Sequence, residues 1–143
     1  MINTDCDPFD VSYIIDDSEV TCKIHKKLLE KSRLSKSQKM YSSPVQALKF
    51  LVRDIKAKKK ILVLLDLEMP GVNGIDFLDI ITGLEASAQQ LSVYVVSSTI
   101  LEHLDNSVIY NSIIKRHFKK PLSPKDLSQK SVINACFEEY ASY

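Results

Sequence analysis

The chain has few cysteines and no long apolar run, and both shortages exclude classes of protein. Its three cysteines, Cys6, Cys22 and Cys136, are odd in number and lack metal-site spacing, which is typical of reduced thiols in a cytoplasmic protein. No apolar run approaches the roughly 20 residues that cross a bilayer. Residues 1–10 contain three Asp and no basic residue, unlike a signal or transit peptide. We therefore expect a cytoplasmic protein with no membrane partner.

An excess of charge of either sign is also absent. The formal net charge is +1, and no basic stripe is interleaved with aromatic residues, as a single-strand binder would need. The short basic run at residues 56–60 is typical of a solvated helix end, where cations suit the dipole. Hydrophobic residues make up 45% of the 143 residues, as in an ordinary globular domain. The composition thus predicts no direct nucleic-acid partner.

The most informative stretch covers residues 61–74. It opens with five consecutive apolar residues, which are typical of a strand buried on both faces of a parallel sheet. Asp66 follows, and Pro70, Gly71 and Gly74 then indicate a loop. Asp66 is therefore predicted at the carboxyl edge of a central strand, where open α/β sheets bind ligands. Taken alone, the pattern fits a strand-ending Asp without a function equally well.

Apolar spacing divides the chain into strands and helices that alternate. Five strands and five helices of this kind predict an α/β fold, a doubly wound parallel sheet with helices on both faces. Residues 11–143 would be one domain, preceded by a loose arm at residues 1–10. The strands are predicted at about 11–15, 36–41, 61–65, 91–96 and 113–118, and the helices at about 19–32, 44–55, 75–84, 101–108 and from 123 onward.

The sequence also predicts where two of the helices begin and which helix residues face the core. Ser43, Pro44 and Gln46 are predicted to start the second helix as a capping box with proline at its first position. Ser123, Pro124 and Asp126 are predicted to start the last helix in the same way. His25 and His103 are expected on the surface, and Cys22 in the core. The predicted inward faces are Val20, Ile24 and Leu28 in the first helix, and Val45, Leu48, Val52 and Ile55 in the second.

Polar groups end four of the five predicted strands. Asp16 and Asp17 follow the first, Asp66 the third, Ser97 the fourth and Lys120 the fifth. Because such ends converge on one edge of the sheet, these side chains should meet. Three crowded carboxylates repel one another unless a cation is present, and oxygen ligands suit Mg²⁺. Asp66 can then act as a nucleophile that forms an aspartyl phosphate, beside a lysine that neutralises the phosphoryl group.

From about Val11 to Tyr140 the chain resembles the receiver domain of two-component response regulators. The resemblance rests on residues 14–18, 65–74, 95–98 and 119–122. Its most specific part is the Asp-x-x-Met-Pro-x-x-x-Gly segment at residues 66–74. It implies a flavodoxin-like (βα)5 fold with the strand order 2-1-3-4-5.

By position, the resemblance implies a role for each strand-end residue. Asp66 would accept a phosphoryl group from the phosphohistidine of a sensor histidine kinase or a histidine phosphotransfer protein. Asp17 would bind Mg²⁺ directly and Asp16 mainly through water, with the backbone carbonyl of Glu68 completing the site. Ser97 and Lys120 would contact the phosphoryl group. Pro121 would follow Lys120 through a cis peptide bond.

The chain also departs from the family pattern. His117 stands where the family usually has Tyr or Phe as the second switch residue after Ser97, and Ser98 stands where Ala or Gly is common. Glu68 and Thr99 lie where family members tune loss of the phosphoryl group. The resemblance implies a signalling phosphoacceptor rather than an enzyme, with its fourth helix, fifth strand and fifth helix as the read-out face. We expect a stand-alone regulator that binds a downstream protein partner or passes phosphate on in a phosphorelay.

Three other functions are compatible with parts of the pattern. A phosphatase of the haloacid dehalogenase type would need a second Asp where Glu68 stands, and a cap domain. A flavodoxin would need a phosphate cradle where Asp16 and Asp17 would repel the flavin phosphate. A degenerate receiver that acts as a phosphorylation-independent scaffold remains the alternative, although loss of Asp66, Lys120 or the acidic pair would be its hallmark.

Overall fold

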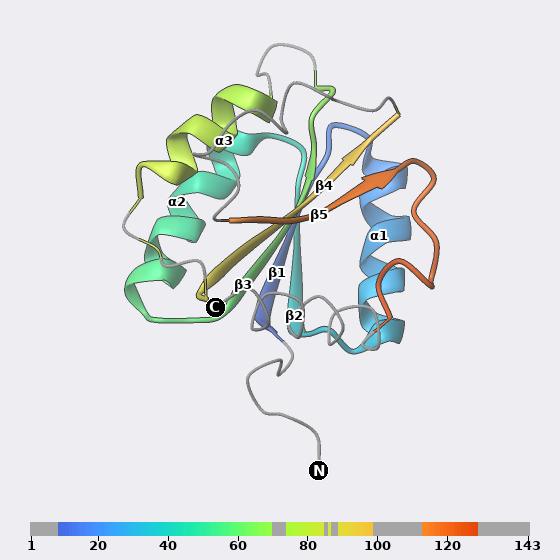
Figure 1. Ribbon diagram of the computed structural model, residues 1–143, viewed down its shortest axis with the longest axis horizontal. Helices are drawn as coiled ribbons and strands as arrows, with labels where there is room; N and C mark the ends of the chain where they lie inside the picture. The colour runs from blue at the N-terminus through green and yellow to red at the C-terminus, as the bar shows by residue number, and fades with distance from the viewer. Residues whose placement is uncertain (1–8, 70–73, 85, 87–88, 99–112, 129–143) are drawn as a thin grey trace, which may run out of the picture.

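The fold is a five-stranded parallel sheet with helices on both faces. The computed structural model describes residues 9–69, 74–84, 86, 89–98 and 113–128. In Figure 1, α1 lies on one face of the sheet, and α2 and α3 lie on the other. The predicted doubly wound sheet and its strand order, β2-β1-β3-β4-β5, are confirmed. The elements are β1 (Phe9–Ile15), α1 (Glu19–Ser32), β2 (Ser35–Tyr41), α2 (Pro44–Lys56), β3 (Ile61–Asp66), α3 (Gly74–Thr82), β4 (Leu91–Ser97) and β5 (Ile114–Lys119).

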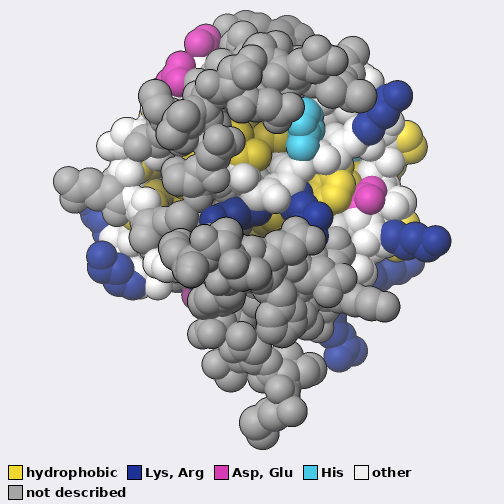
Figure 2. Space-filling view, in the orientation of Figure 1, with side chains coloured by type: hydrophobic (Ala, Val, Ile, Leu, Met, Phe, Trp, Pro, Cys, Tyr) yellow, Lys and Arg dark blue, Asp and Glu magenta, His cyan; other side chains and the backbone are white. Residues whose placement is uncertain are grey.

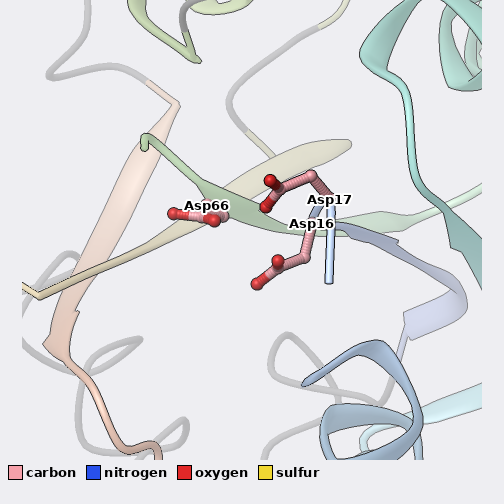
Figure 3. A group of neighbouring side chains, drawn as sticks. All are labelled: Asp16, Asp17 and Asp66. Carbon is pink, nitrogen blue, oxygen red and sulfur yellow. The ribbon is translucent and has the colours of Figure 1, made fainter. Parts of the chain in front are cut away.

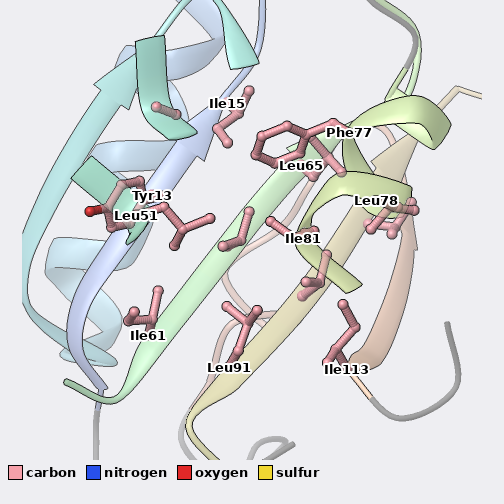
Figure 4. Packing of buried hydrophobic residues seen from close by; sticks show 14 of the residues in the cluster. Tyr13, Ile15, Leu51, Ile61, Leu65, Phe77, Leu78, Ile81, Leu91 and Ile113 are labelled. Atoms are coloured by element: carbon pink, nitrogen blue, oxygen red, sulfur yellow. The ribbon is translucent and has the colours of Figure 1, made fainter. Parts of the chain in front are cut away.

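The central strand β3 is buried on both faces, as its unbroken apolar run predicted. Successive side chains of a strand point to opposite faces, so Val63 and Leu65 join a core beneath α2 and α3, whereas Leu62 and Leu64 join a second core beneath α1. Figure 4 shows the first of these cores, in which Phe77 of α3 packs among strand side chains. The two cores hold β3 in the middle of the sheet, with its carboxyl end at one edge.

The prediction for the inward face of α1 was right only for Leu28, which is partly buried and packs against the core beneath α1. The helix buries Cys22, His25 and Leu29, whereas Val20 is 68% and Ile24 is 52% exposed. Residues spaced by exactly four drift around a helix of 3.6 residues per turn, and the buried face follows the mixed three and four spacing. His25, expected on the surface, is 5% exposed. His103 and the predicted helix at residues 101–108 lie outside the described residues.

The prediction for α2 was wrong in part. Val45 is 66% exposed, whereas Ile55 is buried and Leu48 packs against the core as predicted; the helix also buries Ala47, Leu51 and Asp54. Pro44 does begin the helix, but the Ser43 side chain makes no capping hydrogen bond, so the capping box is not formed. At residues 123–126 half of the predicted box is present, because the Asp126 carboxylate accepts the backbone N–H of Ser123 at 2.9 Å. Residues 124–127 form a turn rather than the predicted start of a helix, and the rest of that predicted helix lies outside the described residues.

The first strand begins two residues earlier than predicted. Phe9 is buried in the core beneath α1, and the Asp10 carboxylate accepts the backbone N–H of Lys60 at 2.8 Å. Both residues were expected in the loose arm, of which residues 1–8 lie outside the described part of the chain. Among the described residues no helix is long and apolar enough to cross a membrane.

Candidate functional site

Three carboxylates converge at the carboxyl edge of the sheet. β1 and β3 are parallel neighbours with Ile15 opposite Leu65, so the residues that follow, Asp16 and Asp66, emerge side by side. One carboxylate oxygen from each of Asp16, Asp17 and Asp66 lies within 4.8 Å of the others. Figure 3 shows the three side chains at the ends of their strands. Asp16 and Asp66 are buried, and Asp17 is exposed.

Backbone N–H groups orient the two buried carboxylates. Asp16 accepts the N–H of Ser18 through Oδ1 at 2.9 Å, and Asp66 accepts the N–H of Glu68 through Oδ1 at 2.9 Å. Ser18 is the N-cap of α1, and its hydroxyl accepts the N–H of Thr21 at 3.2 Å. In both Asp16 and Asp66, one oxygen is fixed by the local turn and the other, Oδ2, is left for contacts across the cluster.

Lys120 makes those contacts. Its Nζ lies 3.2 Å from Asp66 Oδ2 and 3.6 Å from Asp16 Oδ2. The Lys120 backbone N–H donates to the carbonyl of Ser97 at 2.8 Å, which ties the ends of β4 and β5 together. The Lys120–Pro121 bond is cis, as predicted. Burial opposes the charge of Lys120, but its contacts with Asp66 and Asp16 outweigh burial and raise the pKa of the amine.

Ser97 and its neighbours lie beside this cluster. Ser97 is fully buried at the end of β4, and its Oγ is 3.4 Å from Nε2 of His117, an exposed residue of β5. Ser98 donates a hydrogen bond to the carboxylate of Glu68. No pattern in the sequence indicates this second contact, because it joins two exposed side chains on different loops. Thr99, the remaining predicted site residue, lies outside the described residues.

The glycine that ends the 66–74 segment is required by close packing. A Cβ on Gly74 would lie 2.6 Å from Leu67 Cα and 3.0 Å from the carbonyl oxygen of Asp66. Both of these atoms belong to the backbone, so neither can move aside without displacing the chain next to Asp66. The first residue of α3 thus packs directly against the end of β3, and the packing fixes the segment that presents the Asp66 carboxylate.

A family model for the response regulator receiver domain matches residues 13–131. The chain belongs to this family. None of the curated proteins compared with it matches. Solved structures that are 17–21% identical to this chain show the likeness of the fold alone. They include a two-component response regulator from Cytophaga hutchinsonii (17% identity, 92% of this chain and 98% of that chain, TM-score 0.73) and receiver domains from Clostridium thermocellum (21%, 93% and 98%, 0.66) and Methylobacillus flagellatus (18%, 87% and 98%, 0.65).

The acidic cluster of this receiver fits a divalent cation. Receiver domains generally bind Mg²⁺ at an acidic pocket. Burial raises the pKa of Asp16 to about 6, the Ser18 N–H opposes this effect, and the negative charge of Asp66 adds to it. Asp16 Oδ2 is buried without a hydrogen-bond partner, and Lys120 approaches it only at 3.6 Å. Asp16, Asp17 and Asp66 therefore form an oxygen-rich set with excess negative charge, which is the donor set that Mg²⁺ prefers.

Replacement of Asp16 should stabilise the receiver when Mg²⁺ is absent. Because the pKa of Asp16 is higher in the folded than in the unfolded protein, its ionised form opposes folding at pH 7, and stability should rise as the pH falls through 6. We expect Asp16→Asn to increase the free energy of unfolding by about 1–2 kcal/mol at pH 7 in EDTA. Urea denaturation should show this gain shrinking or reversing in 10 mM Mg²⁺, on the order of the concentrations that weak sites need. If Mg²⁺ leaves the gain in stability of Asp16→Asn unchanged, Asp16 does not contribute to a Mg²⁺ site.

His25 has a buried imidazole near the site, and the sequence pattern did not predict its burial. Burial lowers the pKa of His25, the charge of Lys120 lowers it further, and Asp66 opposes both effects. No signal in the sequence marks it, because a lone histidine on an amphipathic helix is as compatible with the surface as with the core. The neutral form of the His25 imidazole is therefore favoured near the charged cluster.

The lowered pKa of His25 predicts a loss of stability in mild acid. The unfolded chain takes up a proton below its ordinary pKa of 6.5 while the folded chain does not, so the stabilising effect is present above pH 6.5 and is lost below it. We expect the free energy of unfolding of wild type, relative to His25→Leu, to fall by up to about 1 kcal/mol between pH 6.5 and 5.5. Comparison of the two proteins isolates this effect from that of Asp16, which has the opposite sign. Parallel stability curves would show that His25 is protonated equally in both states.

Proposed function

We propose that Asp66 accepts a phosphoryl group from a phosphohistidine on a sensor histidine kinase or a histidine phosphotransfer protein. The observation that carries the proposal is the environment of one carboxylate. Asp66 is 3% exposed, is oriented by the Glu68 N–H, faces the Lys120 amine at 3.2 Å, and lies beside Asp16 and Asp17. An Asp66 oxygen attacks phosphorus, the phosphorus–nitrogen bond of the donor breaks, and the imidazole leaves with the electron pair and takes up a proton.

The other residues of the site would stabilise the charge that moves to Asp66. Lys120 already contacts Oδ2 of Asp66, so its amine can contact a phosphoryl oxygen after a small shift. Asp16, Asp17 and Asp66, with the backbone carbonyl of Glu68, would hold Mg²⁺, which when bound neutralises phosphoryl charge. Ser97 would turn its hydroxyl from His117 toward the new group. In this way the chemistry uses each strand-end residue once.

The switch would begin at Ser97. A phosphoryl group adds negative charge and strong acceptors at Asp66, and it shifts the population toward the state in which Ser97 donates to it. His117 would then lose the neighbour that lies 3.4 Å from its Nε2 and could reorient. The face that contains β5 would change, and a downstream protein that binds this face would detect the change. Passing the phosphoryl group on to another histidine is the second possible output.

Residues at the mouth of the site would set how long the phosphoryl group lasts. Glu68 and Thr99 are proposed to tune its hydrolysis by occupying the path of the attacking water. The hydrogen bond from Ser98 constrains the Glu68 carboxylate, so Ser98 acts on the same step.

Exposed apolar residues of α1 offer a docking surface for the phosphodonor. Val20 and Ile24 are 68% and 52% exposed and lie in the first two turns of α1, which directly follows Asp16 and Asp17. Neighbouring exposed apolar side chains beside a reactive group are typical of a protein-binding surface. A donor that packs against Val20 and Ile24 would bring its phosphohistidine to the adjacent carboxylates.

Phosphorylation by a small donor tests the function without knowledge of the partner. Incubation with acetyl phosphate and Mg²⁺ should add one phosphoryl group to the intact protein, as measured by mass spectrometry, and EDTA should prevent the addition. The label should be lost on treatment with hydroxylamine, because an acyl phosphate is cleaved by this nucleophile. If the protein is not phosphorylated by acetyl phosphate in Mg²⁺ but still binds its protein partners, it is instead a phosphorylation-independent scaffold.

A further inference from the structure

Positive charge is concentrated in one part of the chain. Thirteen of the 19 Lys and Arg residues lie within residues 23–60, where only Glu30 and Asp54 are acidic. Thirteen cations less two carboxylates give this segment a charge of +11, and because the chain as a whole is +1, the remainder is −10. The near-neutral total therefore conceals a strongly basic region, which we call the basic flank (the Lys and Arg residues of 23–60).

The fold gathers the basic flank around one edge of the sheet. The segment forms most of α1, the edge strand β2, all of α2 and the turn before β3. Figure 2 shows Lys and Arg side chains on the right, over α1, and on the left, beside the lower part of α2; Asp and Glu side chains lie near α3 and also among the cations over α1. The edge strand β2 lies between the two helices, so cations surround it from both faces of the sheet.

The acidic residues near the flank leave most of this charge uncompensated at the surface. Asp54 is 1% exposed and is contacted by Lys39, Arg53 and Lys59 at 3.4–3.7 Å, so three cations share one buried carboxylate. Lys36 pairs with Asp10 at 3.5 Å, yet 78% of its side chain is exposed. Exposed pairs of this kind are weak and remain available to a partner.

The outer edge of β2 is open in the described part of the chain. β2 pairs with β1 on one side and is last in the order of strands. Its residues Lys36, Ser37 and Met40 are exposed. Gln38 Nε2 donates to the carbonyl of Ser35 at 2.9 Å, so a flexible side chain satisfies one backbone acceptor. An edge strand with free backbone groups can pair with another extended chain.

We propose that the edge of β2 and the basic flank bind an extended acidic segment of another protein as an added sixth strand. Backbone hydrogen bonds to β2 would give the geometry, and carboxylates of the incoming segment would meet lysines of the flank. The same lysines repel the β2 edge of a second copy, so they disfavour self-association while they favour an acidic partner. This surface lies at the opposite side of the sheet from β5, and binding to it does not depend on phosphorylation of Asp66.

A protein segment fits the surface better than other polyanions do. The flank is almost entirely lysine, which acts as a point charge and lacks the bidentate geometry that arginine offers to phosphates. The aromatic rings of this region, Tyr13, Tyr41 and Phe50, stack on one another and are not a platform for bases. Only an extended peptide can also use the open backbone groups of β2.

A synthetic peptide probe tests the proposal. The probe is a fluorescent ten-residue peptide that alternates Glu with Thr, and its control is the same peptide with alternate backbone nitrogens methylated. We expect saturable binding by fluorescence anisotropy, binding at least about tenfold weaker for the methylated peptide, and slower amide exchange across residues 35–41 when the probe is bound. Equal binding of the two peptides, or unchanged exchange in β2, would overturn strand addition.

Charge-reversal variants locate the site. Lys36→Glu on β2 should weaken probe binding several-fold, up to about tenfold, whereas Lys119→Glu on the opposite edge strand β5 makes the same change of net charge and should not. Lys56→Glu, at the exposed end of α2, should also weaken it and serves if Lys36→Glu disturbs the strand. A short DNA duplex and vesicles of phosphatidylserine are the competitors. Binding of either in preference to the peptide, or equal losses in the β2 and β5 variants, would refute the proposal.

Discussion

Asp66→Asn should abolish incorporation of the phosphoryl group while the protein stays folded. The substitution replaces the nucleophilic oxygen by an amide of nearly the same shape, so no acyl phosphate can form at this position. It also removes one of three crowded negative charges, namely the one that Lys120 contacts at 3.2 Å. We therefore expect no mass increase with acetyl phosphate and Mg²⁺, against one phosphoryl group in wild type. Intact mass and a urea denaturation curve on the same sample give both results.

Asp126→Asn is the matched control for this result. Asp126 is also a carboxylate that accepts a backbone N–H at 2.9 Å, but it lies in the turn after β5 and outside the acidic cluster. This variant should be phosphorylated like wild type. Label that persists in Asp66→Asn would place the phosphoryl group on another residue and would refute the role proposed for Asp66.

The convergence of the site could be predicted because it depends on topology rather than on packing detail. Parallel strands that alternate with helices bring their carboxyl ends to one edge of the sheet. Polar residues at the strand ends therefore meet whatever the detailed positions of the helices. Asp16, Asp66, Ser97 and Lys120 are brought together in this way. The reason for Gly74 could not be obtained from the pattern, since it depends on a 2.6 Å approach between two segments.

The inward faces of the helices were harder to predict than the sheet, because apolar character alone does not determine burial. Val20 and Ile24 are apolar but face outward beside the acidic cluster, where a partner can cover them. His25 and Asp54 are polar but face inward, and Asp54 there accepts a hydrogen bond from Tyr13 of β1. Such a contact involves residues far apart in the chain, so no local pattern in the helix predicts it.

Asp54 is the polar residue on which the packing of α2 against the sheet depends. Its carboxylate accepts a hydrogen bond from the Tyr13 hydroxyl in the middle of β1 and lies near Lys39 and Lys59. Burial by itself would raise the pKa of Asp54, but the bond from Tyr13 and the charges of both lysines outweigh it, so the pKa is lowered. The ring of Tyr13 stacks on Tyr41, and that of Tyr41 on Phe50, so the same group of residues joins β1, β2 and α2.

Asp54→Ala should destabilise the protein markedly. It leaves the Tyr13 hydroxyl without its acceptor and three cations without their shared carboxylate, in a position that is 1% exposed. We expect a loss of about 2–3 kcal/mol in the free energy of unfolding, chiefly from the unsatisfied Tyr13 hydroxyl, because the three cations are 30–61% exposed and stay hydrated. Denaturation in urea at pH 7 measures it, with Asp79→Ala, on the exposed face of α3, as the control expected to change stability by less than about 1 kcal/mol.

Two milder variants separate the hydrogen bond from the charge. Tyr13→Phe removes only the hydroxyl and should cost about 1–2 kcal/mol, and Asp54→Asn keeps an acceptor for Tyr13 but removes the charge that the lysines contact. Because the folded pKa of Asp54 is lowered, the stability that depends on its charge is present above pH 3.8 and is lost as the pH falls through the folded value. Asp54→Asn should therefore be less stable than wild type at pH 7 but approach it in acid. Costs of the two substitutions that add fully in the double variant would show that the two side chains act independently, because residues in direct contact are expected to couple.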